Sequence, residues 1–238
     1  MKSINILNIR LDDLSDQELN QLFTNWLKGN EQKIIVTPNP EFLLLARRDK
    51  EFADILNQAN LSLPDGFGLK LVSDIRHRHT GVDTLEQLAK FSTNICLLGS
   101  SESTTAVAKI FYRHNPELKI SIVDPGLVTE NGEVNENILN EINKNSPKIL
   151  AVGLGQGKQE RFITKNLHRL PSVRLAIGVG GAFDMISGKK PRAPRFMRQI
   201  GLEWLWRLAI EPKRWRRIAN AVIIFPIIVF WDKIMKHK

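Results

Sequence analysis

Short apolar segments alternate with longer amphipathic segments along the first 180 residues of the chain. The short segments are bounded by glycine or polar residues, as buried strands are, whereas the longer ones repeat apolar residues at helical spacing. This alternation predicts an α/β fold, with a Rossmann-like, mostly parallel sheet and helices on both faces. We expect strands at Ile4–Ile9, Lys33–Thr37, Asn94–Gly99, Lys119–Asp124, Lys148–Gly153 and Val173–Gly178, and helices at Ser15–Leu27, Pro40–Asn57, Glu102–His114, Val134–Lys144 and Gln159–Leu170.

Two of these helices carry recognisable start signals. Ser15 is followed three residues later by Glu18, the spacing of a capping box. Pro40 suits the first turn of the next helix, where its missing N–H is not needed. These two signals therefore predict where these two helices begin.

The pattern changes near residue 190, where a basic, proline-containing link begins. Two amphipathic helical segments follow, at Arg195–Ile210 and Pro212–Ala221, and then the apolar run Val222–Trp231. We therefore expect a catalytic α/β body at residues 1–189 and a helical, basic, apolar-ended appendage at residues 190–238.

Charge separates the same two parts. Residues 1–187 hold 21 Lys and Arg against 22 Asp and Glu, whereas residues 188–238 hold 13 against 3, a net charge of +10. The basic excess of the chain thus belongs to its last fifth. Such an asymmetry indicates an anionic partner, which could be nucleic acid, a phosphate-bearing ligand or an acidic membrane surface.

The composition of the appendage favours the membrane surface among these partners. Arginines alternate with tryptophans, which prefer the membrane interface, and an apolar tail has no role in binding nucleic acid. The run Val222–Trp231 is too short to cross a hydrocarbon core of about 30 Å. We expect it to lie along one leaflet or dip into it, with packing of the tail onto the body as the alternative.

Polar residues follow one of the expected strands and one further short apolar stretch. Thr37 and Asn39 stand in a turn stiffened by two prolines, where they either face a pocket or cap the next helix. Asp65 follows a short apolar stretch that ends at Leu63-Pro64, and it precedes Gly66. It is a candidate general base, although a turn or cap role suits it equally.

Two glycine-rich turns follow later strands. Gly153–Gly157 precedes Lys158, and Gly178–Gly181 precedes Asp184. Backbone N–H groups at such turns can bind phosphate, and two of them suggest room for a large phosphorylated ligand such as a nucleotide sugar. The turn at Gly153–Gly157 has the spacing of neither a Walker A loop nor a dinucleotide fingerprint, and a merely tight turn suits it equally. No Asp-x-Asp pair near a strand end provides a cage for a divalent ion.

Taken together, these segments resemble the WecG/TagA/CpsF family of bacterial glycosyltransferases. The resemblance rests on ordered motifs that cover most of the chain: Thr37-Pro38-Asn39-Pro40-Glu41, Pro64-Asp65-Gly66, Arg78 with Gly81 and Asp83, Gly155-x-x-Lys158-Gln159-Glu160, Gly178-Val179-Gly180-Gly181-x-Phe183-Asp184, Gly188-x-x-x-Arg192-Ala193-Pro194, and Gly201-Leu202-Glu203-Trp204-x-x-Arg207-Leu208-x-x-Glu211-Pro212-x-Arg214.

The resemblance implies transfer, with inversion, of an N-acetylmannosamine-type sugar from a UDP donor to undecaprenyl-diphosphate-linked N-acetylglucosamine in cell-wall or surface polysaccharide synthesis. It implies no cofactor, no metal and no nucleic acid, and a cytoplasmic protein bound peripherally to the inner face of the plasma membrane. It also implies these roles: Asp65 as the catalytic base, Thr37, Asn39, Arg78 and Gln159 around the sugars, Asp184 on the nucleotide, and Arg207, Arg214 and Arg217 closing over the diphosphates.

This sequence departs from the family pattern at two positions beside the expected sugar pocket. Gly157 stands where the family has proline, and His79 stands where it has an apolar residue. A hexosyl or uronosyl transferase of exopolysaccharide or capsule synthesis is therefore an alternative within the same family. A nucleotide or nucleic-acid binder without enzymatic activity is the alternative from another class.

Overall fold

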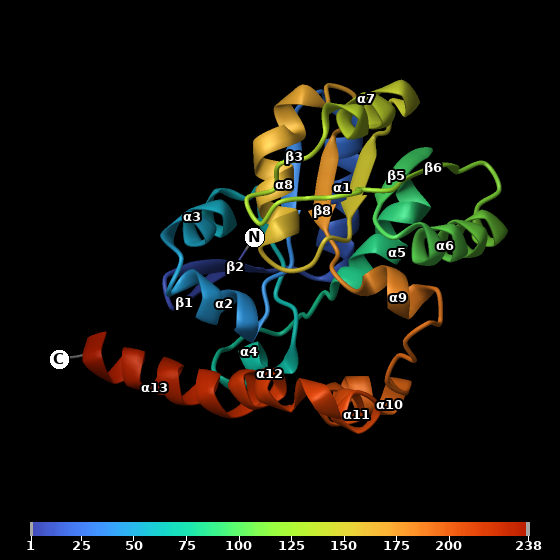
Figure 1. The fold of residues 1–238 in the computed structure, drawn as a ribbon. Helices are drawn as coiled ribbons and strands as arrows, with labels where there is room; N and C mark the ends of the chain where they lie inside the picture. Colours follow the sequence, from blue (N-terminus) through green and yellow to red (C-terminus); the bar gives the residue numbers. More distant parts are fainter. Residues whose placement is uncertain (1, 237–238) are drawn as a thin grey trace.

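A parallel sheet of six strands forms the centre of the protein in the computed structural model, which describes residues 2–236 (Figure 1). The strands lie in the order β4-β3-β8-β7-β5-β6, and every neighbouring pair is parallel. Their bounds are β3 (Lys33–Val36), β4 (Leu61–Ser62), β5 (Asn94–Leu98), β6 (Lys119–Val123), β7 (Ile149–Val152) and β8 (Leu175–Gly178). The two-residue strand β4 was not predicted from the sequence.

Helices cover both faces of this sheet. They include α1 (Asp16–Lys28), α5 (Gly81–Phe91), α6 (Ser101–His114), α7 (Glu136–Asn145) and α8 (Lys158–Asn166), the last followed by a 3₁₀ turn at Leu167–Arg169. Ile95 and Leu97 of β5 are buried with residues of α1, α5 and α6. Cys96 and Leu98 point the other way and are buried with α7 and α8. The predicted α/β fold is confirmed.

The N-terminal segment forms a hairpin, which corrects one prediction. The expected strand Ile4–Ile9 contains a reversal at Leu7 and Asn8, whose φ angles are 51° and 65°. Two successive positive φ values give a tight turn of the kind that suits the twist of a hairpin. Strands β1 (Lys2–Ile6) and β2 (Ile9–Asp13) therefore pair antiparallel in a separate sheet. The prediction of a single strand was wrong.

The hairpin supports the loop that leads to the site. The Asp13 carboxylate accepts hydrogen bonds from the backbone N–H groups of Arg76 and His77, at 3.1 and 2.8 Å. Asp12 accepts one from the backbone N–H of Ser62 in β4, at 2.9 Å. These bonds fix the segment just before Arg78.

The helix expected at Pro40–Asn57 is two helices, α2 (Pro40–Ala46) and α3 (Lys50–Gln58). The break occurs because Asp49 has extended backbone and its side chain caps α3, accepting a hydrogen bond from the Phe52 N–H at 2.9 Å. Pro40 does occupy the first turn of α2, and the capping box at Ser15 is present. Both start signals are confirmed.

The C-terminal segment is helical throughout most of its length. After α9 (Ala182–Ile186), it contains α10 (Arg195–Gln199), α11 (Glu203–Ile210), a 3₁₀ turn at Pro212–Arg214, α12 (Trp215–Ala219), a π-helical turn at Asn220–Ile224 and α13 (Phe225–Lys236). The helix predicted at Arg195–Ile210 is broken at Gly201, which has a φ of 81° and packs against the Phe67 ring.

From Pro212 to Met235 the helical segments are continuous, giving 24 residues with a mean hydropathy of 1.8 in their most apolar window. By length and composition alone this helix could cross a membrane. The run Val222–Trp231 is thus part of a longer helix, and its own length does not exclude a membrane span.

The C-terminal helices run along the edge of the body where the strands end (Figure 1). Phe225 and Val229 are buried in a cluster with Phe42 and Leu43 of α2 and with Leu69 of α4 (Phe67–Leu71). Burial of these two apolar side chains holds the helix on the body.

Candidate active site

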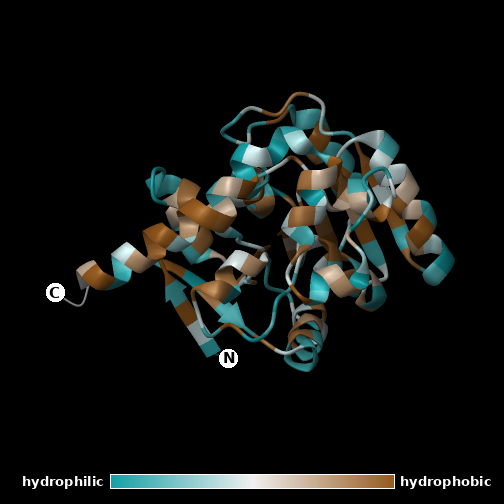
Figure 2. Ribbon diagram, turned by 90° about the horizontal axis from the view of Figure 1, so that it is seen from below, coloured by the Kyte–Doolittle hydropathy of each residue, from teal (hydrophilic) through white to brown (hydrophobic). Residues whose placement is uncertain are grey.

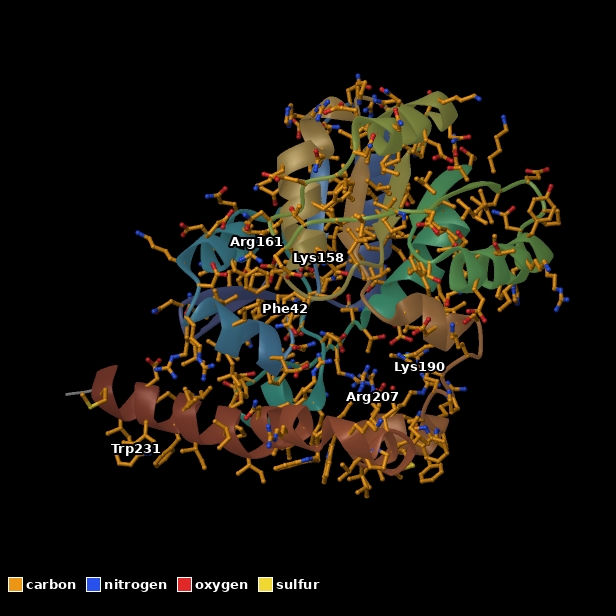
Figure 3. All side chains as sticks on the ribbon, viewed as in Figure 1. Phe42, Lys158, Arg161, Lys190, Arg207 and Trp231 are labelled. Carbon is orange, nitrogen blue, oxygen red and sulfur yellow. The ribbon has the colours of Figure 1, made fainter. Side chains whose placement is uncertain are left out.

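The carboxyl ends of the parallel strands open into a cleft between the body and the C-terminal helices. This is where ligands bind in open parallel sheets. Figure 3 shows Arg207 directed from α11 into the space beneath the sheet, close to Lys190. Seven of the predicted site residues line the cleft: Thr37, Asn39, Asp65, Gln159, Arg207, Arg214 and Arg217. Arg78 lines an adjoining limb, which shares Asp65 with the cleft.

The loops after β3 and β4 are joined at the base of the cleft. The Asp65 N–H donates to the Pro38 carbonyl at 2.8 Å, so the two strand ends are held side by side. Asn39 caps α2, its Oδ1 accepting from the N–H groups of Glu41 and Phe42 at 2.9 and 3.1 Å. Asn39 therefore has both roles considered from the sequence, since it caps a helix and lines the cleft.

Asp65 lies where the cleft and its limb meet. The surrounding protein desolvates its carboxylate and raises its pKa to about 6, although Arg78 and Arg207 favour the charged form. Glu203 adds to the rise through like-charge repulsion. A carboxylate with a pKa near neutrality is well suited to accept a proton and release it again.

Glu203 is a site residue that sequence reasoning did not single out. Its carboxylate lies 3.1 Å from the Arg207 guanidinium and 3.5 Å from that of Arg78. Only 13% of its side-chain surface is exposed, and it lines both the cleft and the limb. The signal in the sequence was its position as one of three acidic residues in a segment of net charge +10.

Gln159 and Glu160 tie together the two glycine-rich turns. The Gln159 side chain accepts a hydrogen bond from the Gly180 N–H at 2.9 Å and donates one to Glu160 at 2.7 Å. Glu160 also accepts from the Gly157 N–H at 2.7 Å. Burial raises the pKa of Glu160 to about 7, against the hydrogen bonds that favour its charged form. Gln159 thus positions the walls of the cleft that it lines.

A side chain at Gly178 would be incompatible with this arrangement. An added Cβ would lie 2.6 Å from the Gln159 amide nitrogen and 2.7 Å from a Glu160 carboxylate oxygen. Glycine is therefore required here for close approach between β8 and α8. Lys158, considered from the sequence as a phosphate ligand, does not line the cleft and forms an ion pair with Glu130 at 3.0 Å.

The appendage arginines are held by carboxylates. Arg217 donates two hydrogen bonds of 2.8 Å to Glu41 of α2, and Arg214 contacts Glu211 at 2.9 Å. The first pair connects the appendage to the body. Both arginines line the cleft and its limb, so their guanidinium groups can meet an anionic ligand there.

Asp184 is the predicted site residue that lines neither the cleft nor the limb. Its carboxylate accepts a hydrogen bond from the Ser103 hydroxyl at 2.7 Å and contacts Lys190 at 3.0 Å. Lys190 itself lines the cleft. Asp184 thus holds a cation at the edge of the cleft, and a contact between Asp184 and the nucleotide stays a prediction.

The model of the glycosyl transferase WecG/TagA/CpsF family matches residues 4–238. This chain belongs to that family. Two relatives named N-acetylglucosaminyldiphosphoundecaprenol N-acetyl-beta-D-mannosaminyltransferase come from Bacillus. The protein of Bacillus subtilis (strain 168) is 33% identical over 198 residues, 79% of this chain and 75% of that protein. The protein of Bacillus spizizenii (strain ATCC 23059 / NRRL B-14472 / W23) is 32% identical over 222 residues, which cover 87% of this chain and 84% of that protein.

A relative of the same name from Staphylococcus aureus (strain NCTC 8325 / PS 47) is 26% identical over 249 residues, 99% of this chain and 93% of that protein. The match thus includes the appendage as well as the body. The resemblance inferred from the motifs is confirmed, and the enzyme class follows from it.

The cleft of this WecG/TagA/CpsF transferase has the components that glycosyl transfer needs. A carboxylate of raised pKa can accept the proton of an attacking hydroxyl, and arginines can balance the charge of a departing phosphate. Within residues 2–236, no group of three or more His, Cys, Asp or Glu side chains is arranged to hold a metal ion.

Proposed function

We propose that this enzyme transfers an N-acetyl-β-D-mannosaminyl group from a UDP donor to N-acetylglucosaminyl-diphosphoundecaprenol, with inversion at the anomeric carbon. The names of the relatives supply the sugar and the acceptor. The observation that carries the proposal is the position of Asp65, a carboxylate with a raised pKa between a polar cleft and a limb that reaches the appendage.

In this proposal Asp65 removes the proton from the acceptor hydroxyl as its oxygen attacks the anomeric carbon of the donor. The bond from that carbon to the UDP oxygen breaks in the same step, so the configuration inverts. The proton stays on Asp65 until solvent takes it. A pKa of about 6 leaves most of the carboxylate ionised at neutral pH, as this role requires.

The leaving UDP carries developing negative charge, and we assign its stabilisation to Arg207, Arg214 and Arg217. All three line the cleft, and Arg207 also lies close enough to influence the charge on Asp65. Preorganised cations in a partly desolvated site stabilise such charge strongly. In this proposal they take the place of a divalent ion.

We propose that residues 190–238 bind the inner surface of the cytoplasmic membrane while closing the cleft. Trp231 points away from the body in Figure 3, and many residues of α13 carry the brown of hydrophobic side chains in Figure 2. Eight large apolar residues along the described part of this segment are at least half exposed: Phe196, Ile200, Trp215, Ile223, Ile227, Phe230, Trp231 and Met235. We call these eight side chains the apolar face.

Basic residues accompany the apolar face, since Arg195, Lys213 and Arg216 are exposed on the same segment. Apolar side chains together with cations bind anionic lipid surfaces. The burial of Phe225 and Val229 against the body favours a helix that lies along the membrane over one that crosses it. A lipid-linked acceptor would then meet the cleft at the surface where it resides.

A panel of UDP-sugars tests this function, with one lipid-linked N-acetylglucosaminyl diphosphate as acceptor and with wild type and Asp65→Asn compared. We expect UDP release with UDP-N-acetylmannosamine that depends on the acceptor and is lost in the variant. Release with another hexose or a uronic acid donor would instead assign the enzyme to a different sugar. Binding of UDP without any transfer would overturn the proposal.

A further inference from the structure

The limb beside the cleft differs from it in character. The walls that it shares with the cleft are polar: Asn39, Glu41, Asp65, Glu203, Arg207, Arg214 and Arg217. Apart from Arg78, the walls that it does not share with the cleft are apolar or glycine. Most of those walls come from α4, which contributes Phe67 and Gly68, and from the C-terminal segments α11, α12 and the π-helical turn, which contribute Trp204, Ile218, Ala221 and Val222. We call this limb the apolar slot.

The backbone around the apolar slot has two unusual features. At Gly68 the body and the C-terminal helix approach so closely that an added Cβ would lie 3.0 Å from the Ala221 carbonyl oxygen. Ala221 and Val222 belong to the π-helical turn, a rare conformation that occurs often at functional sites. Small residues and a widened helical turn thus shape this wall.

The position of the slot connects two surfaces. One part of it contains Asp65, and its C-terminal wall belongs to the same helical turn as Ile223, a residue of the apolar face. The slot also contains Arg78, Arg214 and Arg217, whose charge suits a diphosphate. An apolar chain attached to a diphosphate fits both the cations and the apolar walls.

We propose that the apolar slot binds the first isoprenoid units of the acceptor lipid. The proposal rests on the function proposed above, and it divides the site into a polar cleft for the donor and an apolar slot for the acceptor chain. The diphosphate of the acceptor would lie among the arginines. Its terminal sugar would then reach Asp65, and the rest of the chain would leave towards the apolar face.

The test compares two acceptors, N-acetylglucosaminyl diphosphates that carry either an undecaprenyl chain or a single methyl group, both assayed in detergent. Ala221→Phe places a ring in the slot, and Ile218→Ala removes an apolar wall without adding bulk. Asn220→Phe is the matched control, because Asn220 is exposed and lines neither the slot nor the cleft.

For the undecaprenyl acceptor, we expect Ala221→Phe and Ile218→Ala to raise KM by about tenfold, the effect of losing contact with roughly two methylene groups. For the methyl acceptor, we expect both variants to keep the KM and kcat of wild type, which also shows that they are folded. The control should resemble wild type with both acceptors.

Equal effects on the two acceptors, or no effect on either, would overturn the slot as the chain site while leaving the transferase function intact. If wild type transfers sugar to neither acceptor, the proposed function itself fails. The two failures are therefore distinguishable.

Discussion

The Glu203 carboxylate of α11 lies 3.5 Å from the Arg78 guanidinium of the body, and 125 residues separate the two in sequence. Both side chains are largely shielded from solvent. Because Glu203 also contacts Arg207, it holds two cations beside Asp65. The appendage therefore contributes directly to the electrostatic environment of the proposed base.

This relationship predicts the behaviour of Glu203→Gln. Removing the negative charge lowers the pKa of Asp65, because Glu203 helps to raise it. The acid limb of the kcat/KM profile should therefore move to lower pH, and kcat should fall because Arg78 and Arg207 lose their partner. A pH–rate series measures both. The control is Glu102→Gln, which removes an exposed partner of Lys189. An unmoved acid limb would contradict the role of Glu203.

Asp65→Asn should lower kcat by about 10²–10⁴-fold, the usual contribution of a general base. Binding of UDP, measured by calorimetry, should persist in this variant because the arginines remain. In wild type the base must be ionised, so activity should decline as pH falls through about 6, the pKa of Asp65. Near-normal turnover in the variant would remove Asp65 from this role.

Removal of divalent ions with EDTA should leave turnover unchanged, because arginines balance the charge of the leaving diphosphate in our proposal. Arg207→Ala should in contrast lower kcat by about 10²–10³-fold, as the loss of one preorganised donor does. Arg48→Ala is the control, since Arg48 is exposed on the body and lines neither the cleft nor its limb. Activity that EDTA abolishes and a divalent ion restores would refute the assignment.

Phe225→Ala should destabilise the protein by about 3–5 kcal/mol, because Phe225 is fully buried where α13 meets the body. Phe230→Ala should change stability by no more than about 0.5 kcal/mol, because residue Phe230 is 62% exposed. Urea denaturation of the two variants provides the comparison. Equal stabilities would mean that α13 does not depend on Phe225 for docking.

The double variant Phe230→Ser, Trp231→Ser should bind anionic vesicles roughly tenfold more weakly, because two side chains of the apolar face no longer enter the interface. High salt should weaken binding of wild type as well, since it screens the basic residues. Leu127→Ser serves as control, because Leu127 is fully exposed on the body. Vesicle sedimentation measures the binding, and equal binding by the double variant and wild type would argue against the apolar face.

Local patterns in the sequence were sufficient for much of the fold. The capping box at Ser15 and the proline at residue 40 marked helix starts because these signals act within one turn of the chain. The separation of charge near residue 190 is also a property of the sequence alone, and the division into body and appendage that it indicates stays a prediction. The family motifs identified the transferase class, and their residues at the strand ends do gather around one cleft.

Tertiary structure decided what local patterns do not contain. The turn at Leu7 and Asn8 has no glycine, so its positive φ angles depend on the pairing of β1 with β2. The pairing of Glu203 with Arg78 required the appendage to fold back over the strand ends. Asp184 follows a strand as a site residue should, yet it faces Ser103 and Lys190. Periodicity sets which residues are buried, whereas long-range packing sets which of them meet.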